Sequence, residues 1–216
     1  MYALSKRCLD IFLASALLLL TAPVLLTACV SILLTMGRPV FFRQVRPGRD
    51  EEPFTLIKLR TMRPASEGDV STQDRITPVG RFLRRSSIDE LPSLLNVLQG
   101  KLSFVGPRPL LQRYLPYYTD RERLRHTVPP GLTGWAQIHG RNRLSWEDRL
   151  ELDAWYVEHR SFKLDLQIIL RSVILVASQR DVVDAPDTLF DDLDVERQHQ
   201  IGPTAQKTPT AQKTAW

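Results

Sequence analysis

The sequence has few of the residues that build disulfide frameworks and zinc sites. Its two cysteines, Cys8 and Cys29, lie at the edge of and within an apolar segment, and its four histidines are scattered. These cysteines form neither a disulfide framework nor a metal-ligand spacing, and the histidines make no zinc motif. The glycine-rich stretch 129–142 lacks the fingerprint of a phosphate-binding loop. We therefore expect structural roles for the cysteines and histidines.

Charge is absent from Ile11–Met36, a run of 26 residues. The run is too long for an ordinary signal peptide, and its basic C-terminal flank lacks a small-residue cleavage site. A straight helix of this length would cross a hydrocarbon core of about 30 Å, but Pro23 at the midpoint would kink or break it. Lys and Arg, which mark the cytoplasmic side, flank both ends. This pattern favours a re-entrant helix-break-helix, and a membrane-spanning helix is the alternative.

The remaining charge is unevenly distributed. The chain carries a formal charge of +5, and eleven Lys and Arg face six acids between Arg38 and Arg85. A basic region beside an apolar segment favours an anionic membrane surface or phosphorylated substrates over nucleic acid; a solvated charged face is the alternative. Asp181–Glu196 has seven acids and no base, and two AQKT copies follow. This composition predicts a disordered tail over 181–216.

Most of the chain between these regions has helical patterning. Two β-strands are the exception: Pro39–Arg46 and Pro53–Met62, joined by a turn-rich connection, predict a β-hairpin. Lys58 and Arg60 are two residues apart and share one strand face, which makes that face a candidate phosphate platform. Phe162–Ser178 carries an apolar stripe interrupted by charges. It predicts either an interfacial helix on the membrane surface or a helix packed on the core.

The central stretch of the sequence places two adjacent acids, Asp89 and Glu90, among arginines. Arg84 and Arg85 precede the pair, and a Gly-Pro-Arg-Pro turn containing Arg108 follows it. Acids set among phosphate-binding cations suggest phosphoryl chemistry.

A structural role also fits the two acids. Ser87 followed three residues later by Glu90 matches a capping box, and acids in a first helical turn are favoured by the helix dipole. Pro92 would lie inside such a helix, where it removes a backbone donor. A helix that starts near Leu91, with the acids in an exposed turn before it, fits better. The spacing alone leaves catalysis and capping both open.

Several stretches resemble the bacterial sugar transferases, the monotopic phosphoglycosyl transferases. They are the apolar hairpin with Pro23, Leu56–Met62 (LIKLRTM), Arg81–Pro109 and Pro130–Asn142 (PGLTGWAQIHGRN). DELP followed by N-V-L-x-G-x-x-S-x-V-G-P-R-P is highly specific, and the resemblance runs from about residue 3 to about residue 180. Many members have Ser-Pro at the membrane break, whereas this chain has Ala22-Pro23.

The resemblance implies a small member of the family, mainly α with one β-hairpin. Residues 1–37 would form the re-entrant membrane hairpin, and 38–180 a cytoplasmic catalytic domain at the bacterial inner membrane. The implied activity is transfer of a sugar-1-phosphate from a nucleoside diphosphate sugar, expected to be a UDP-sugar, to undecaprenyl phosphate, with release of UMP. This step would initiate polysaccharide or glycoconjugate assembly. Membrane lipids are further partners, nucleic acid is not expected, and a homo-oligomer is left open.

The resemblance also assigns roles to residues. Asp89 matches the family nucleophile and Glu90 its partner acid, and both are candidate ligands for the Mg²⁺ that the family implies. The basic positions of the active site are matched by Lys58, Arg84, Arg108 and Arg141. A carboxylate can attack phosphorus and hold the phosphoryl group covalently, so Asp89 would carry an aspartyl-phosphosugar. Mg²⁺ needs only one or two carboxylates besides substrate phosphates.

Two other functions remain open. A lipid-phosphate hydrolase would use water in place of the lipid acceptor. A non-enzymatic scaffold would bind anionic lipid or nucleic acid through its basic region, and its binding would fall steeply with salt.

Overall fold

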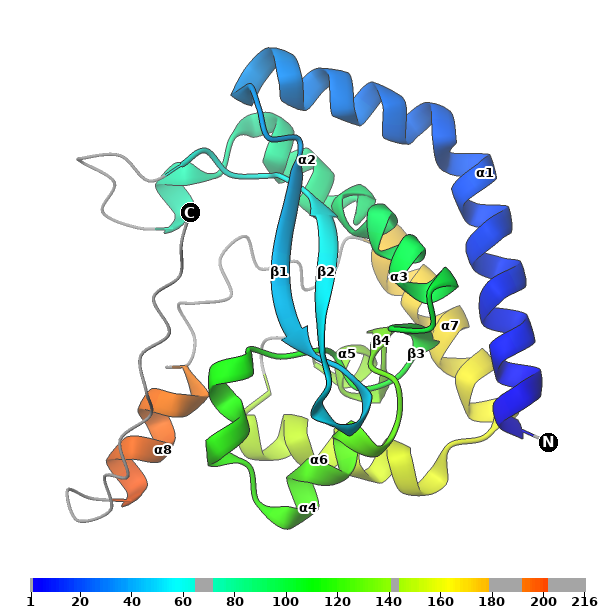
Figure 1. Ribbon diagram of the computed structural model, residues 1–216, viewed down its shortest axis with the longest axis vertical. Helices are drawn as coiled ribbons and strands as arrows, with labels where there is room; N and C mark the ends of the chain where they lie inside the picture. Colours follow the sequence, from blue (N-terminus) through cyan, green and yellow to red (C-terminus); the bar gives the residue numbers. More distant parts are fainter. Residues whose placement is uncertain (1, 65–71, 141–143, 179–191, 202–216) are drawn as a thin grey trace.

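The computed structural model describes residues 2–64, 72–140, 144–178 and 192–201. Most of them are helical, and the predicted β-hairpin is confirmed; a second, parallel pair of short strands was not predicted. Figure 1 shows the hairpin across the middle of the molecule, with α1 arching around it. The elements are α1 (Tyr2–Met36), β1 (Phe41–Pro47), β2 (Pro53–Leu59), α2 (Pro78–Arg85), α3 (Leu94–Leu98), β3 (Ser103–Val105), α4 (Asp120–Arg123), β4 (Gly131–Thr133), α5 (Trp135–His139), α6 (Trp146–His159), α7 (Phe162–Ala177) and α8 (Leu193–Ile201).

The apolar run lies in α1, which is one continuous helix with Pro23 inside it. Figure 1 shows α1 bent near its middle, so the expected break is a bend without an interruption. The hydroxyls of Thr21 and Thr27 donate to the carbonyls of Leu17 and Pro23, each at 2.6 Å. Proline removes one helical hydrogen bond, and hydroxyl back-bonding of this kind often bends helices. Together they account for a bend that leaves the helix intact.

The start of α1 is fastened to the rest of the molecule by polar contacts. Lys6 and Tyr2 reach the buried carboxylate of Asp165 in α7 at 2.7 and 2.8 Å. Arg7 donates to the carbonyls of Val97 and Leu98 at the end of α3. The Val97 carbonyl also accepts from the Gly100 amide, so Arg7 adds a cationic donor to the carbonyls at the end of α3.

The end of α1 is fastened by Arg60. The sequence predicted that Arg60 would share a phosphate platform with Lys58, but its guanidinium donates to the carbonyls of Met36, Gly37 and Arg38. β2 ends at Leu59, so Arg60 lies beyond the regular strand face. The assignment to the phosphate platform is therefore wrong: Arg60 caps the last turn of α1, whose terminal carbonyls need donors.

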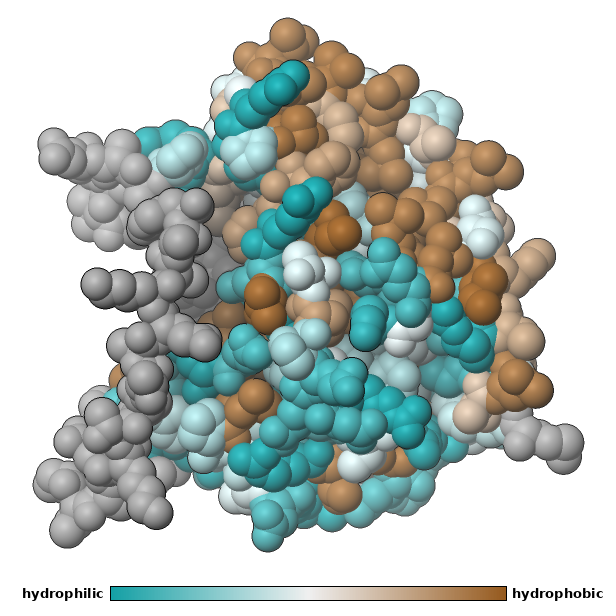
Figure 2. All heavy atoms as spheres, in the orientation of Figure 1, coloured by the Kyte–Doolittle hydropathy of each residue, from teal (hydrophilic) through white to brown (hydrophobic). Residues whose placement is uncertain are grey.

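A large apolar surface remains exposed on α1 and α7. By length and composition, α1 could cross a membrane, and brown apolar side chains cover its position in Figure 2. In α7, Leu164 and Ile168 are buried while Val173 and Ile174 are more than 60% exposed. Packing on the core is therefore confirmed for one face of α7, and the interfacial role of the other, apolar face stays a prediction.

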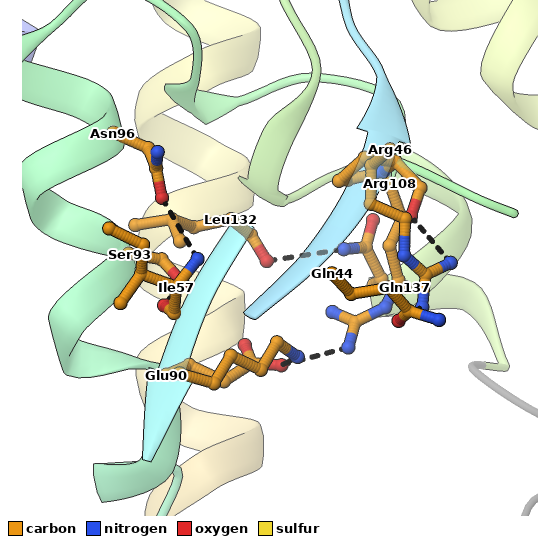
Figure 3. Close-up of polar contacts among 11 residues, drawn as sticks. Gln44, Arg46, Ile57, Glu90, Ser93, Asn96, Arg108, Leu132 and Gln137 are labelled. Atoms are coloured by element: carbon orange, nitrogen blue, oxygen red, sulfur yellow. Dashed lines mark hydrogen bonds and ion pairs between the residues drawn. The ribbon is translucent and has the colours of Figure 1, made fainter. Parts of the chain in front are cut away.

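The hairpin is antiparallel, with Phe42 opposite Lys58. The free edge of β2 is covered by side chains from the chain that follows. Asn96 accepts from the amide of Ile57 (Figure 3). It also donates to the carbonyl of Thr55, while Ser93 donates to the carbonyl of Ile57. These bonds replace a neighbouring strand and fix α3 and the turn before it against β2.

Part of the segment expected to be disordered is an ordered helix, α8. Leu193 is fully buried in an apolar cluster that includes Tyr114 and Trp146. Asp192 accepts a hydrogen bond from the Tyr114 hydroxyl at 2.7 Å, and Arg197 forms an ion pair with Glu122. The prediction of disorder is wrong for residues 192–201, because one leucine in an acidic stretch gives no periodic signal. Residues 181–191 and 202–216, with both AQKT copies, lie outside the described residues.

Replacing the buried leucine of α8 tests this docking. Leu193→Ala should lower the free energy of unfolding by about 2–4 kcal/mol, because it removes a fully buried side chain and leaves a cavity. Val195→Ala, at a position that is 39% exposed on the same helix, should change it by less than about 1 kcal/mol. Denaturant unfolding of both variants measures the difference, and equal small effects would show that α8 contributes nothing to the fold.

Candidate active site

The acid pair lies in a 3₁₀ turn, Ile88–Ser93, directly before α3. Ser87 precedes the turn in the left-handed region, with a φ of 56°, and its side chain makes no capping bond within the described residues. The carboxylate of Glu90 binds cations and does not reach back to Ser87. The capping alternative therefore fails. The acids do precede the helix as expected, but α3 begins at Leu94 rather than near Leu91, and the turn is half-buried rather than exposed.

Three segments far apart in the sequence meet at Glu90. Its Oε1 atom accepts from Lys58 Nζ of β2 at 2.6 Å. The same atom accepts from Arg108 Nη2 of the Gly-Pro-Arg-Pro turn at 2.8 Å (Figure 3). Arg84, at the end of α2, acts electrostatically on Asp89. Its Nη1 is buried without a hydrogen-bond partner in the described part of the chain. The structure thus brings Asp89, Glu90 and three predicted cations together.

The two acids differ in their electrostatics. Burial and the neighbouring charge of Glu90 raise the pKa of Asp89 to about 6, although Lys58, Arg84 and Arg108 oppose the shift. Burial would also raise the pKa of Glu90, but the charges and hydrogen bonds of Arg108 and Lys58 hold it well below its usual range. Glu90 is thus a fixed, ionised anchor. Asp89 makes no hydrogen bond or ion pair within the described residues, so it is available to a ligand.

The turn that carries Arg108 is held by a buried ion pair. Arg125 is buried, donates to the Arg108 carbonyl at 2.6 Å, and pairs with the buried carboxylate of Asp153 in α6 at 2.9 Å. It also donates to the Tyr118 hydroxyl at 3.0 Å. A buried charge pair with further hydrogen bonds has well-defined geometry. Arg125 and Asp153 therefore hold the backbone from which Arg108 reaches Glu90.

The two glycine-containing motifs of the sequence pack directly on each other. β3 and β4 pair in parallel, and the Gly131 amide donates to the Pro107 carbonyl at 2.9 Å. A Cβ atom at Gly131 would lie only 2.1 Å from the Gly106 nitrogen. This approach requires glycine at position 131, and it places the loop 130–134 under the Gly-Pro-Arg-Pro turn.

The sequence-based prediction missed Gln44 and Arg46. The hairpin register places Phe42 opposite Lys58, so Gln44 and Arg46 follow on the same face at two-residue spacing. Arg46 donates to Gln44 Oε1 at 2.6 Å, and burial together with the charge of Arg108 lowers its pKa. The alternation of side chains in the sequence of β1 already puts Gln44 and Arg46 on one face. Only the pairing register with β2 shows that this is the face of Lys58.

Two other predicted positions are accounted for differently. Arg141 is outside the described residues. Pro23 lies in the bend of α1, as a structural rather than a chemical element.

The acid pair could hold a magnesium ion. Among the described residues no group of three or more His, Cys, Asp or Glu side chains could do so, but Mg²⁺ needs only one or two carboxylates when substrate phosphates supply the rest. Both cation contacts of Glu90 use Oε1, which leaves Oε2 for a metal. The donor set of Asp89 and Glu90 therefore fits Mg²⁺.

Comparison with known proteins agrees with the geometry. The family model described as "Bacterial sugar transferase" matches residues 1–179. The chain belongs to this family. It is therefore a transferase, and the resemblance noted in the sequence is confirmed.

Three relatives of the transferase illustrate the family. "Uncharacterized sugar transferase EpsL" of Bacillus subtilis (strain 168) is 53% identical, covering 78% of this chain and 85% of that protein. A "UDP-glucose:undecaprenyl-phosphate glucose-1-phosphate transferase" of Escherichia coli (strain K12) is 42% identical over 79% of this chain, but only 39% of that protein is covered. "Exopolysaccharide production protein ExoY" of Rhizobium meliloti (strain 1021) is 33% identical, covering 82% of this chain and 87% of that protein.

Breaking the buried ion pair of Arg125 and Asp153 should destabilise the transferase. Asp153→Ala leaves the Arg125 guanidinium buried without its counter-charge, which costs about 3–5 kcal/mol of the free energy of unfolding. Glu151→Ala, on the exposed side of α6 where Glu151 pairs with Arg121, should leave that free energy nearly unchanged. Denaturant unfolding compares the two variants, and similar effects would contradict a supporting role for the buried pair.

The raised pKa of Asp89 predicts a pH-dependent gain of stability in Asp89→Asn. The pKa is about 3.9 in an unfolded chain and about 6 in the fold, so the ionised side chain destabilises the fold above about pH 6 and not below about pH 4. Without Mg²⁺, Asp89→Asn should raise the free energy of unfolding at pH 8 by on the order of 2 kcal/mol.

The gain should shrink to nothing at pH 4, because Asp89 is then protonated in the fold and is as neutral as the asparagine that replaces it. Unfolding curves at pH 4, 6 and 8 measure it. Asp50→Asn, at a side chain that is 68% exposed, is the matched control, and a gain from Asp89→Asn that is constant across pH would contradict the assignment.

Proposed function

We propose that the transferase moves a sugar-1-phosphate from a UDP-sugar to undecaprenyl phosphate through a covalent intermediate on Asp89, releasing UMP. The observation that carries the proposal is the division of roles in the acid pair. Glu90 is held by Lys58 and Arg108, whereas Asp89 lies among the same cations without a partner in the described residues. A free carboxylate surrounded by cations suits attack on a phosphate. The names of the relatives make UDP-glucose the first donor to test.

The first step forms a bond between an Asp89 carboxylate oxygen and the sugar-bearing phosphorus. The phosphoanhydride P–O bond breaks, and its electron pair leaves on UMP, so no proton is transferred. In the second step a phosphate oxygen of the polyprenol phosphate attacks the same phosphorus and restores the carboxylate. Such transfers depend mainly on positioning and charge neutralisation, which Lys58, Arg84 and Arg108 provide. Mg²⁺ held by Asp89 and Glu90 would, when bound, add charge neutralisation and orient the phosphates.

The fastening of α1 supports a monotopic, re-entrant membrane helix. Arg7 near its start and Arg60 at its end bind the two ends of the helix to one body. A helix that crossed the bilayer would carry its ends to opposite sides and could not keep both sets of contacts. We place the exposed faces of α1 and α7 in the bacterial inner membrane, with the site on the cytoplasmic side. There the transferase would initiate a polysaccharide or glycoconjugate, in keeping with the exopolysaccharide relative.

UMP release with concomitant lipid product tests the proposal. The full chain in lipid nanodiscs, with Mg²⁺ and undecaprenyl phosphate, should release UMP from UDP-glucose or another UDP-sugar of a panel. Asp89→Asn should lower the rate by on the order of 10³-fold or more, because it removes the nucleophile. Asp50→Asn should keep the wild-type rate. Full activity in Asp89→Asn would sink the covalent mechanism, and free sugar phosphate without lipid product would indicate a hydrolase.

A further inference from the structure

Arg46 is a half-buried cation without an acidic partner. Its guanidinium donates to Gln44 Oε1 at 2.6 Å and, over a long 3.4 Å, to the Pro109 carbonyl. Its Nε atom is buried without a hydrogen-bond partner, and no carboxylate of the described residues pairs with it. A buried charge that is only partly satisfied is unfavourable, so these contacts alone do not explain why an arginine lies here.

The charge that acts most strongly on Arg46 is that of another arginine, Arg108. Figure 3 shows Arg46 and Arg108 beside each other, with Gln44 at the same end of the view. Burial and the charge of Arg108 lower the pKa of Arg46 to about 10. Burial lowers the pKa of Arg149 as well, and Arg108 contributes to that shift. Like charges gathered in this way are stabilised when an anion binds between them.

The position of Arg46 relative to the acid pair suggests which anion this is. Arg46 lies four residues after Phe42, the strand partner of Lys58, which is about 13 Å along a strand. The Arg108 side chain lies between the two positions, because it binds Glu90 and is seen beside Arg46 in Figure 3. A donor with its sugar-bearing phosphate at Asp89 and Lys58 could therefore extend its second phosphate toward Arg108 and Arg46.

We propose that Arg46 and Arg108, with Gln44 orienting Arg46, form a second anion subsite that takes the phosphate of the departing nucleoside monophosphate. The inference rests on the proposed function and adds the leaving-group side of the site. When the phosphoanhydride bond breaks, the electron pair stays on the leaving phosphate, which gains negative charge. A cation placed there binds the transition state more strongly than the ground state. The subsite would thus serve both donor binding and product departure.

Gln44→Glu is the sharpest test. The change keeps the shape of the side chain and turns the 2.6 Å hydrogen bond into an ion pair that neutralises Arg46 in place. The variant should fold at least as well as wild type, because it supplies the missing counter-charge. Its affinity for UMP should nevertheless fall at least about tenfold. The new carboxylate would pair with the Arg46 guanidinium in place of the UMP phosphate, and a hydrogen bond between charged groups is among the stronger ones.

Two further variants complete the experiment. Arg46→Gln should weaken UMP binding by a similar factor through loss of the cation. Gln99→Glu is the control, because it adds the same charge at an exposed position in a separate pocket that Arg43 and Lys101 also line. The UMP affinity of this variant should stay within about twofold of wild type. Calorimetric titration of the full chain in nanodiscs with UMP, and with uridine as the phosphate-free probe, needs no turnover.

The outcomes separate this inference from the proposed function. A wild-type chain that binds UMP more tightly than uridine, with that preference reduced in Gln44→Glu, supports the subsite even if no donor in the panel reacts. A chain that transfers sugar phosphate but shows no such preference, or keeps it fully in Gln44→Glu, overturns the subsite and leaves the transferase assignment standing. Parallel loss of UMP and uridine binding would also overturn it.

Discussion

The carboxylate of Glu90 is the point on which the site depends. One oxygen accepts from Lys58 and Arg108, so a single ionised group ties the hairpin, the acid turn and the Gly-Pro-Arg-Pro turn together. The same contacts separate the two acids chemically. Glu90 is stabilised as an anion by its partners, whereas Asp89, beside that anion and half-buried, is disfavoured in its charged form. A pair with pKa values pushed apart in this way can divide the roles of anchor and nucleophile.

Each partner of Glu90 is held in turn by a different part of the fold. Lys58 is placed because Asn96 and Ser93 bind the open edge of β2 and so fix the acid turn beside it. Arg108 is placed by the buried pair of Arg125 and Asp153, which binds its backbone carbonyl from below. Side chains that take no part in the proposed reaction therefore set the distance between the cations and the acids.

The sequence placed the acid pair, Lys58, Arg84 and Arg108 in one candidate site, and the structure brings them together. They lie in short motifs that resemble one family throughout. The sequence-based prediction failed where the outcome depends on tertiary contacts. Arg60 has the spacing of a partner for Lys58, but it follows the last residue of β2. Its guanidinium donates instead to the carbonyls at the end of α1. Arg46 could be found only from strand register. The docking of α8 rests on Leu193, which hydrophobic periodicity cannot detect in so short and acidic a segment.

The alternation of β2 links the chemistry to the membrane. Lys58 points to the acid pair, whereas its neighbour Leu59 lies in the apolar cluster with Ala28 and Ile32 of α1, as opposite faces of a strand require. Ile88, directly before Asp89, packs on the same cluster. With α1 in the bilayer as proposed, the reacting groups would lie one side chain away from the membrane helix. A lipid phosphate could then reach the nucleophile while its polyprenyl chain stays in the membrane.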